Sequence, residues 1–128
     1  EAVVPKPVDG LVSSRALTMR YEEGFRIDDL EELAAHGVDC EALVLRIIQV
    51  YAHQLFVDGL FHADPHPSNL MVQVTHGRAL PVILDFGMTI RLSDAQRIGY
   101  ARLTYAVQQM DVHALTAAVA SLGISSIA

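Results

Sequence analysis

Hydrophobic positions recur at helical spacing in one long segment of the chain, roughly residues 40–58. The apolar side chains of this segment fall on one broad stripe, made by Leu43, Val44, Ile47, Ile48, Tyr51, Ala52, Leu55 and Phe56. Asp39 is placed to cap the start of the helix, and Gly59 is placed to end it. The pattern therefore predicts an amphipathic helix whose apolar stripe faces a core.

Shorter helices are predicted on either side. Asp28 or Asp29 can cap a short segment, DLEELAAHG, which has two glutamates in its first turn and ends at Gly37. Near the C-terminus, periodic apolar residues predict a helix over roughly 94–110 and another that reaches about residue 122. The helices thus lie in two groups, separated by the middle of the chain.

Three segments have the composition of strands. RALTMRY at 15–21 is one, and LMVQV at 70–74 and PVILD at 81–85 form a pair joined by a turn that contains His-Gly. Residues 1–14 hold prolines, a glycine and paired serines, and are expected to be irregular apart from a short extended piece. The fold class predicted is α+β, mainly helical, with a short strand and a small β-hairpin.

Length and charge narrow the function classes. With 128 residues the chain is expected to form a single domain or part of one. Fifteen acidic residues stand against nine Lys and Arg, without a basic run, so nucleic acid is excluded as an expected partner. The single cysteine, Cys40, excludes an intrachain disulfide and a cysteine-based zinc site, and is expected to pack between helices.

Hydropathy suggests that part of the surface is normally covered. Hydrophobic residues make up 52% of the chain, a high share for a small domain, which indicates a missing partner surface. Arg46, Gln49 and His53 interrupt the longest apolar stretch, so we expect a soluble chain without the ~20-residue span that a bilayer requires. Because the chain starts at Glu1 and stops on apolar residues, we expect a fragment of a longer protein.

The strongest chemical signal is the segment FHADPHPSNLM at 61–71, followed by LDFG at 84–87. The spacing His62-x-Asp64-x-x-x-x-Asn69, with a strand that ends in Asp85-Phe86-Gly87, is typical of phosphoryl transfer. There, one aspartate lies near the attacking oxygen, while the asparagine and the second aspartate hold magnesium on the nucleotide phosphates. Magnesium prefers such oxygen ligands, and two prolines in the loop limit its motion.

These residues resemble the signature of the UbiB family of atypical protein-kinase-like proteins, also called the AarF-domain-containing or ADCK kinases. The family's H-x-D-P-H-P-G-N loop is similar to FHADPHPSN, and its DFG segment is similar to LDFGM. Its interlobe hinge resembles LTMRYEEGFRIDD, and its approach to the catalytic loop resembles QLFVDGLFHADPHP. The resemblance covers roughly residues 15–110. It implies the large lobe of a kinase-like domain without its small lobe: hinge about 15–27, helical lobe about 28–60, catalytic loop 61–69, DFG 85–87 and C-terminal helices about 94–122.

The resemblance also implies roles for individual residues. Asp64 would be the catalytic-loop aspartate and His62 the structural histidine of that loop, whereas Asn69 and Asp85 would be the magnesium ligands. Backbone groups around the hinge would face the adenine of ATP, at Arg20, Tyr21 and Glu22. The implied cofactors are ATP and Mg²⁺.

The implied function is ATP binding and hydrolysis or phosphotransfer, linked to coenzyme Q or lipid metabolism. The implied partners are the small lobe of the same protein, lipid or quinone pathway proteins and a membrane surface. A mitochondrion, a plastid or the bacterial cytoplasm is the location that the resemblance implies. Only five residues, MTIRL, separate Gly87 from the expected helix cap at Ser93, so the platform with which protein kinases bind peptides is not expected.

Two departures from the pattern stand out. Ser68 replaces the usual glycine of the loop, which costs little if the backbone angle is ordinary and about 1 kcal/mol or more if it is left-handed. The only lysine is Lys6, in a proline-flanked segment, so the lysine with which a kinase-like small lobe grips phosphates is missing, and so is a glycine-rich or alanine-rich phosphate loop.

Three other functions remain open at this point. The loop also resembles that of aminoglycoside or choline phosphotransferases, H-x-D-x-H-x-x-N. His62, Asp64 and His66 have a spacing that suits zinc or iron ligands in a metal-dependent hydrolase, although that hypothesis leaves Asn69 and DFG unexplained. A pseudokinase that serves as a binding module would keep the fold without the chemistry.

Overall fold

The computed structural model describes residues 1–123 and has mixed secondary structure, 46% helical and 24% strand. The chain is thus an α+β protein in which helix exceeds strand, as the sequence predicts. It divides into two compact units, one formed by residues 1–50 and 63–88 and the other, among the described residues, by 51–62 and 89–123. The prediction of a single domain, or part of one, stays a prediction. The predicted apolar C-terminal end, residues 124–128, lies outside the described residues.

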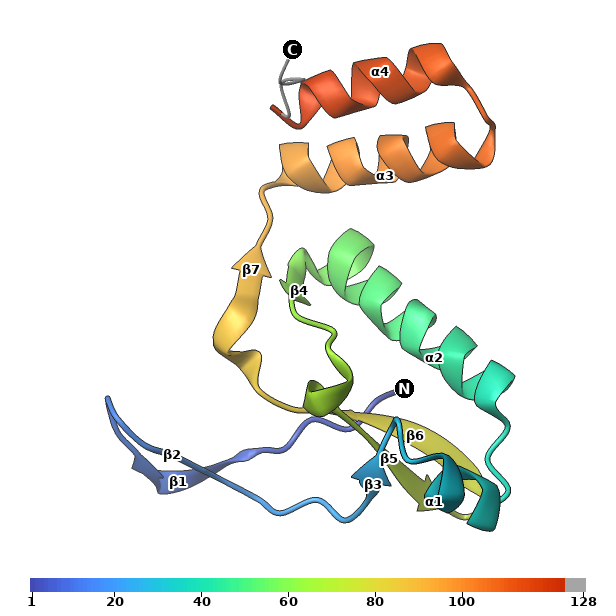
Figure 1. Ribbon diagram of the computed structural model, residues 1–128. Helices are drawn as coiled ribbons and strands as arrows, with labels where there is room; N and C mark the ends of the chain where they lie inside the picture. Colours follow the sequence, from blue (N-terminus) through green and yellow to red (C-terminus); the bar gives the residue numbers. More distant parts are fainter. Residues whose placement is uncertain (124–128) are drawn as a thin grey trace. The chain divides into compact units, whose positions relative to one another are not determined.

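The first unit contains two sheets (Figure 1). β1 (Pro7–Val12) pairs with β2 (Leu17–Met19), so the first residues of the chain are more regular than the sequence indicates. The other sheet has the order β3-β5-β6, with all neighbours antiparallel. Its strands are β3 (Phe25–Arg26), β5 (Leu70–Thr75) and β6 (Arg78–Ile83).

β5 and β6 form a tight hairpin around His76 and Gly77. Both turn residues have positive φ, 51° and 73°, as a two-residue turn between right-twisted strands requires. Thr75 faces Arg78 across the turn, and the ladder continues to Leu70 opposite Ile83. The hairpin therefore has its turn at one end and carries, at its other end, the two segments that hold the candidate site.

The core of the first unit lies between this sheet and two helices. α1 (Leu30–Ala35) is capped by Asp29, whose carboxylate accepts a hydrogen bond from the Glu32 backbone N–H. α2 (Cys40–His53) continues into a π-helical turn, Gln54–Asp58, and so fills the predicted span 40–58. Leu33, Leu43 and Val72 form the buried cluster, against which other apolar residues pack: Phe25, Ile27, Val38, Ile47, Val74 and Ala79.

Gly24 allows β3 to approach β5 closely, and this leads to a testable prediction. A Cβ atom at Gly24 would lie 2.6 Å from the Val72 carbonyl oxygen, and Val72 is fully buried. Gly24→Ala is therefore expected to lower the free energy of unfolding by about 1–3 kcal/mol, because the backbone of β3 has to move away from the sheet. Urea denaturation measures this change. Gly10 also has a positive φ, +77°, but no atom lies within 4 Å of an added Cβ, so Gly10→Ala measures the backbone strain alone, and Gly24→Ala is expected to cost more.

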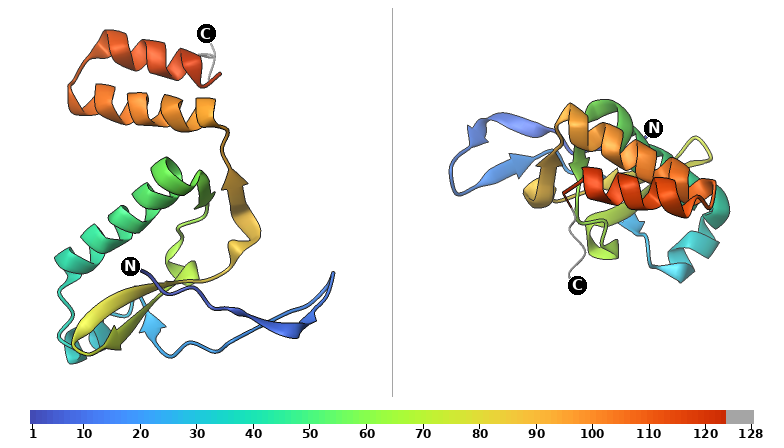
Figure 2. Two further views of the ribbon diagram at one scale, coloured as in Figure 1. Left: turned by 180° about the vertical axis from the view of Figure 1, so that it is seen from behind. Right: turned by 90° about the horizontal axis from the view of Figure 1, so that it is seen from above.

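The second unit contains a short sheet and a helical hairpin. β4 (Leu60–His62) pairs with β7 (Thr89–Arg91), and α3 (Asp94–Gln108) and α4 (Val112–Ser121) run side by side in both views of Figure 2. A capping box formed by Ser93 and Gln96 starts α3, and the Asp111 carboxylate caps α4. Gly99 lets the two helices approach, since a Cβ there would meet the Leu122 side chain at 2.6 Å.

The helical run Cys40–Asp58 bears on the membrane prediction. Its 19 residues are long and apolar enough to cross a bilayer, judged by length and composition alone, and 6% of the apolar window is buried. The expectation that Arg46, Gln49 and His53 rule out such a segment is therefore wrong by this measure. The core helix of a soluble protein passes the same test, and Leu43 of this run belongs to the core described above. Length and composition alone thus do not assign the run to a membrane.

Candidate active site

Backbone and side-chain hydrogen bonds fold the segment that follows Ala63 into a closed loop. The His66 N–H donates to the Asp64 carbonyl and the Asn69 N–H to the His66 carbonyl, both at 2.8 Å. The Asn69 carboxamide nitrogen donates to Asp64 Oδ2 at 3.0 Å and lies 3.3 Å from the Asp64 carbonyl oxygen. Asp64 and Asn69 are both half-buried. The loop therefore holds these two side chains against each other.

The sheet brings Asp85 to the same end of the hairpin. The Leu84 N–H donates to the Asn69 carbonyl at 2.8 Å, which extends the β5-β6 ladder by one step beyond Leu70 and Ile83. Asp85 follows directly, is exposed, and has φ of +48°, a left-handed conformation that aspartate tolerates better than most residues. Backbone strain of this kind collects at functional sites. The Asp64, Asn69 and Asp85 set predicted from spacing thus gathers at one edge of one sheet.

Gly87 holds the carboxylate of Asp85 in place. Its N–H donates to Asp85 Oδ1 at 3.0 Å, within a short 3-10 turn, Phe86–Met88. A Cβ on Gly87 would lie 3.0 Å from the same oxygen, which is tighter than an ordinary contact. The Met88 carbonyl accepts from the Ala63 N–H at 2.8 Å and ties this turn to the start of the loop. The contact with Asp85 therefore explains why a glycine, without a Cβ atom, fits at this position of DFG, and the sequence pattern alone does not reveal this contact.

The donor atoms of this edge fit magnesium. Asn69 offers a carboxamide oxygen and Asp85 a carboxylate, both hard oxygen ligands, and magnesium commonly takes one or two protein ligands together with substrate phosphates and water. Among residues 1–123, no group of three His, Cys, Asp or Glu side chains is placed to hold a metal. This finding argues against the hydrolase hypothesis, in which His62, Asp64 and His66 would bind zinc or iron.

Ser68 contributes to the loop and does not strain it. It lies in a 3-10 turn, Pro67–Asn69, and is not among the residues with positive φ. Its N–H donates to His66 Nδ1 at 3.2 Å, and its Oγ lies 2.9 Å from the same nitrogen and 3.4 Å from Asn69 Oδ1. Because the backbone angle at Ser68 is ordinary, a serine in place of glycine causes no left-handed backbone strain in the loop.

We expect Ser68→Gly, which restores the glycine of the UbiB signature, to destabilise the protein by about 1 kcal/mol. The glycine loses the hydroxyl contacts and adds chain entropy to the unfolded state. Chemical denaturation measures the change, and Ser68→Ala separates the two contributions because it removes only the hydroxyl. An increase in stability with glycine would contradict the hydrogen-bonded loop described here.

His62 occupies a structural position. Its side chain is 1% exposed, and its backbone N–H donates to Gln54 Oε1 at 2.9 Å. The imidazole packs edge-on to the Tyr51 ring, with Tyr51 Oη 3.4 Å from Nδ1. The side chain is thus packed inside the chain, and its role as the structural histidine of the loop stays a prediction.

The predicted hinge residues lie in an extended segment between β2 and β3. Arg20 and Tyr21 are exposed, and Glu22 is half-buried. The Arg20 N–H already donates to the Lys6 carbonyl at 2.9 Å, and the Glu23 carbonyl accepts from Gln73 Nε2 at 3.2 Å. The segment is therefore tethered to β5. Adenine contacts by Tyr21 and Glu22 remain a prediction, whereas the N–H of Arg20 is already engaged.

An ion pair that sequence analysis missed lies near the loop. The Arg26 guanidinium donates to both carboxylate oxygens of Asp28, at 2.9 and 2.7 Å, and this hydrogen bonding, reinforced by the positive charge of Arg26, lowers the pKa of Asp28 from its ordinary 3.8. A lowered carboxyl pKa stabilises the fold above that ordinary value, and the effect disappears as pH falls through the folded-state pKa. The pair is solvent-exposed, so it contributes little.

Comparison with known proteins identifies the class to which this geometry belongs. The sequence model of the ABC1 atypical kinase-like domain matches residues 1–119. The chain belongs to this family, whose members include proteins named AarF domain-containing kinases. The family match also favours this assignment over aminoglycoside or choline phosphotransferases.

Several curated relatives carry kinase names. The chain is 35% identical over 122 residues to "AarF domain-containing kinase 1" of Drosophila melanogaster, and the aligned region covers 94% of the chain and 24% of that relative. It is 34% identical over 110 residues to "Protein ACTIVITY OF BC1 COMPLEX KINASE 8, chloroplastic" of Arabidopsis thaliana, and the aligned region covers 86% of the chain and 14% of that relative. The chain therefore spans a quarter or less of the length of these two relatives.

Proposed function

We propose that the protein carrying this chain binds ATP with magnesium and transfers or hydrolyses the γ-phosphoryl group, and that these residues form the large-lobe part of its site. One observation carries the proposal: Asn69 is hydrogen-bonded to Asp64 through its side chain and to the residue before Asp85 through its backbone. This links the aspartate, asparagine and DFG aspartate that phosphoryl transfer requires.

Each side chain has a distinct task in this proposal. Asn69 and Asp85 would hold magnesium, which neutralises charge on the phosphate tail. Asp64 accepts from Asn69 at Oδ2, and in this proposal its carboxylate would also accept the proton of the hydroxyl or water that attacks the γ-phosphorus. The two prolines that flank His66 and the hydrogen bonds within the loop hold Asp64 in one position, which lowers the entropic cost of orienting the nucleophile.

The segment after DFG supports a small acceptor or water over a protein substrate. Only β7 and Leu92 lie between Met88 and the Ser93 cap of α3, which leaves no room for a long peptide-binding segment. The resemblance to UbiB proteins adds a link to quinone or lipid metabolism. The phosphate-gripping lysine would come from other residues of the protein, because Lys6 is the only lysine here and lies beside β1.

A nucleotide titration tests the proposal on the native full-length protein. Calorimetry with ADP and with ATP, each in magnesium and in EDTA, is expected to show binding only with magnesium, and phosphate release from ATP is expected to follow the same dependence. Binding without release or transfer would favour the binding-module hypothesis. Equal nucleotide affinity in magnesium and in EDTA would contradict the proposed site.

A further inference from the structure

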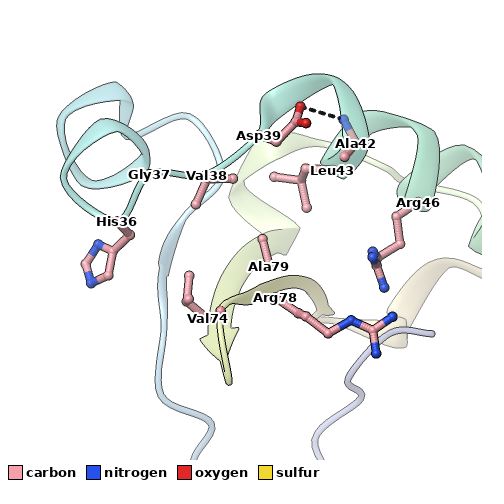
Figure 3. Close-up of a pocket in the computed structure, with 11 residues that line it drawn as sticks. His36, Gly37, Val38, Asp39, Ala42, Leu43, Arg46, Val74, Arg78 and Ala79 are labelled. Carbon is pink, nitrogen blue, oxygen red and sulfur yellow. Dashed lines mark hydrogen bonds between the residues drawn. The ribbon is translucent and has the colours of Figure 1, made fainter.

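A polar cavity lies in the first unit, and Asp64, Asn69 and Asp85 are not among its lining residues. Its volume is about 210 Å³, and its walls come from the α1–α2 connection, the first turns of α2 and the turn end of the β5-β6 hairpin (Figure 3). The apolar part of the wall includes Val38, Leu43, Val74 and Ala79. A cavity of this size is smaller than the pockets that hold drug-sized ligands, and it suits a small ion or the end of a larger molecule.

Two arginines from different elements line this cavity. Arg46 comes from α2 and Arg78 from the first residue of β6, and both side chains extend toward the same end of the cavity in Figure 3. Arg46 is half-buried, and its Nε is buried without a hydrogen-bond partner. Within residues 1–123, neither guanidinium takes part in an ion pair. Because its Nε is shielded from solvent, an anion in the cavity would contact Arg46 through the terminal Nη atoms.

The other ionisable groups of the cavity do not supply that partner. The Asp39 carboxylate accepts from the Ala42 N–H at 3.0 Å as the cap of α2, which directs it to the helix end. The His36 ring stacks on Phe25 with ring centroids 5.0 Å apart, and its Nδ1 lies 2.9 Å from the Glu32 carbonyl oxygen. The cavity therefore combines two cationic groups with a single carboxylate, that of Asp39, which accepts a hydrogen bond from the backbone of α2.

We propose that this cavity binds a phosphate group, either inorganic phosphate or a phosphomonoester, through Arg46 and Arg78. The planar guanidinium fork matches phosphate oxygens, and two of them outweigh the single negative charge of Asp39 in the cavity. The site is separate from the magnesium edge, because Arg78 lies at the turn of the hairpin and Asp85 follows the opposite end of β6.

Calorimetric titration of the native full-length protein in EDTA tests this site without magnesium. Inorganic phosphate and glycerol phosphate are titrated separately, so that a free ion and an ester are distinguished, and chloride at equal ionic strength serves as the reference. We expect saturable binding of at least one, with the dissociation constant raised at least tenfold by Arg46→Met and by Arg78→Met. Arg78 is exposed, so its variant tests the site even if the Arg46 variant fails to fold.

Two controls separate this site from other effects. Arg15→Met removes the same charge from an exposed position in the β1–β2 connection and is expected to leave phosphate binding unchanged. Asp85→Asn is also expected to leave it unchanged, which distinguishes the cavity from the proposed nucleotide site. Equal phosphate binding by wild type and by the Arg46 and Arg78 variants, or no saturable binding, would show an adventitious ion only and overturn the proposal.

Discussion

Asp85→Asn is expected to abolish the magnesium-dependent part of nucleotide binding. The substitution removes the negative charge that the proposed site offers to the metal, while a carboxamide of the same size keeps the oxygen that accepts from the Gly87 N–H. Asparagine also tolerates the positive φ of +48° at this position, so the backbone is not expected to change. Loss of a metal ligand should cost at least the roughly 10–100-fold in metal affinity seen for supporting residues.

Titration of ADP with magnesium against wild type and the variant measures this effect. Asp9→Asn, the same chemical change at an exposed position of β1, is the matched control and should bind like wild type. Thermal unfolding of both variants checks that the fold is retained. Unchanged magnesium-dependent affinity in the Asp85 variant would remove Asp85 from the proposed site, and the nucleotide would then have to bind elsewhere.

Asp64→Asn is expected to separate binding from chemistry. Asp64 is the proposed base, and a carboxamide cannot accept the proton of the attacking group, so turnover should fall about 10²–10⁴-fold. The new carboxamide still offers an oxygen to the Asn69 side chain, which preserves the closed loop. Magnesium-dependent nucleotide affinity should therefore remain within about threefold of wild type, a change below roughly 1 kcal/mol.

Phosphate release under saturating nucleotide measures turnover for the variant, for wild type and for the same Asp9→Asn control. The decisive result is a loss of turnover without a loss of affinity. If both fall together, Asp64 acts in holding the loop or the metal. If turnover is unchanged, the activity does not depend on this aspartate, and the proposed mechanism is wrong.

The helices were the most predictable part of the fold. The capping residues Asp29, Ser93 and Asp111 are local signals, and the corresponding helices begin where those caps stand. The apolar stripe from Leu43 to Phe56 predicted the span of its helix, but the prediction that the whole stripe faces a core is wrong for Val44 and Ile48, which are 53% and 57% exposed. Periodicity and capping depend on residues three or four positions apart, so they can be read from the sequence without knowledge of the tertiary structure.

Several strands were not predictable in the same way. β3, β4 and β7 have only two or three residues each, too few for an alternating pattern, and they form because a partner strand lies beside them. The division into two compact units also escaped prediction, since the first unit combines residues 1–50 with 63–88. Such non-local groupings depend on contacts that sequence spacing does not encode.

The candidate site shows the same contrast. The sequence by itself determined which side chains are candidates for the site: Asp64, Asn69 and Asp85. It also predicted that Asp64 and Asn69 lie in a loop and that Asp85 lies at the end of a strand, because these signals depend on residues close together in the sequence. Only the tertiary structure decided that the β5-β6 ladder joins Asn69 to Leu84, that Asp85 takes a left-handed backbone and that His62 is buried. It also decided that Arg46 and Arg78, 32 positions apart in the sequence, share one cavity. Hydrogen bonds and packing between distant segments create these features, and no local pattern specifies them.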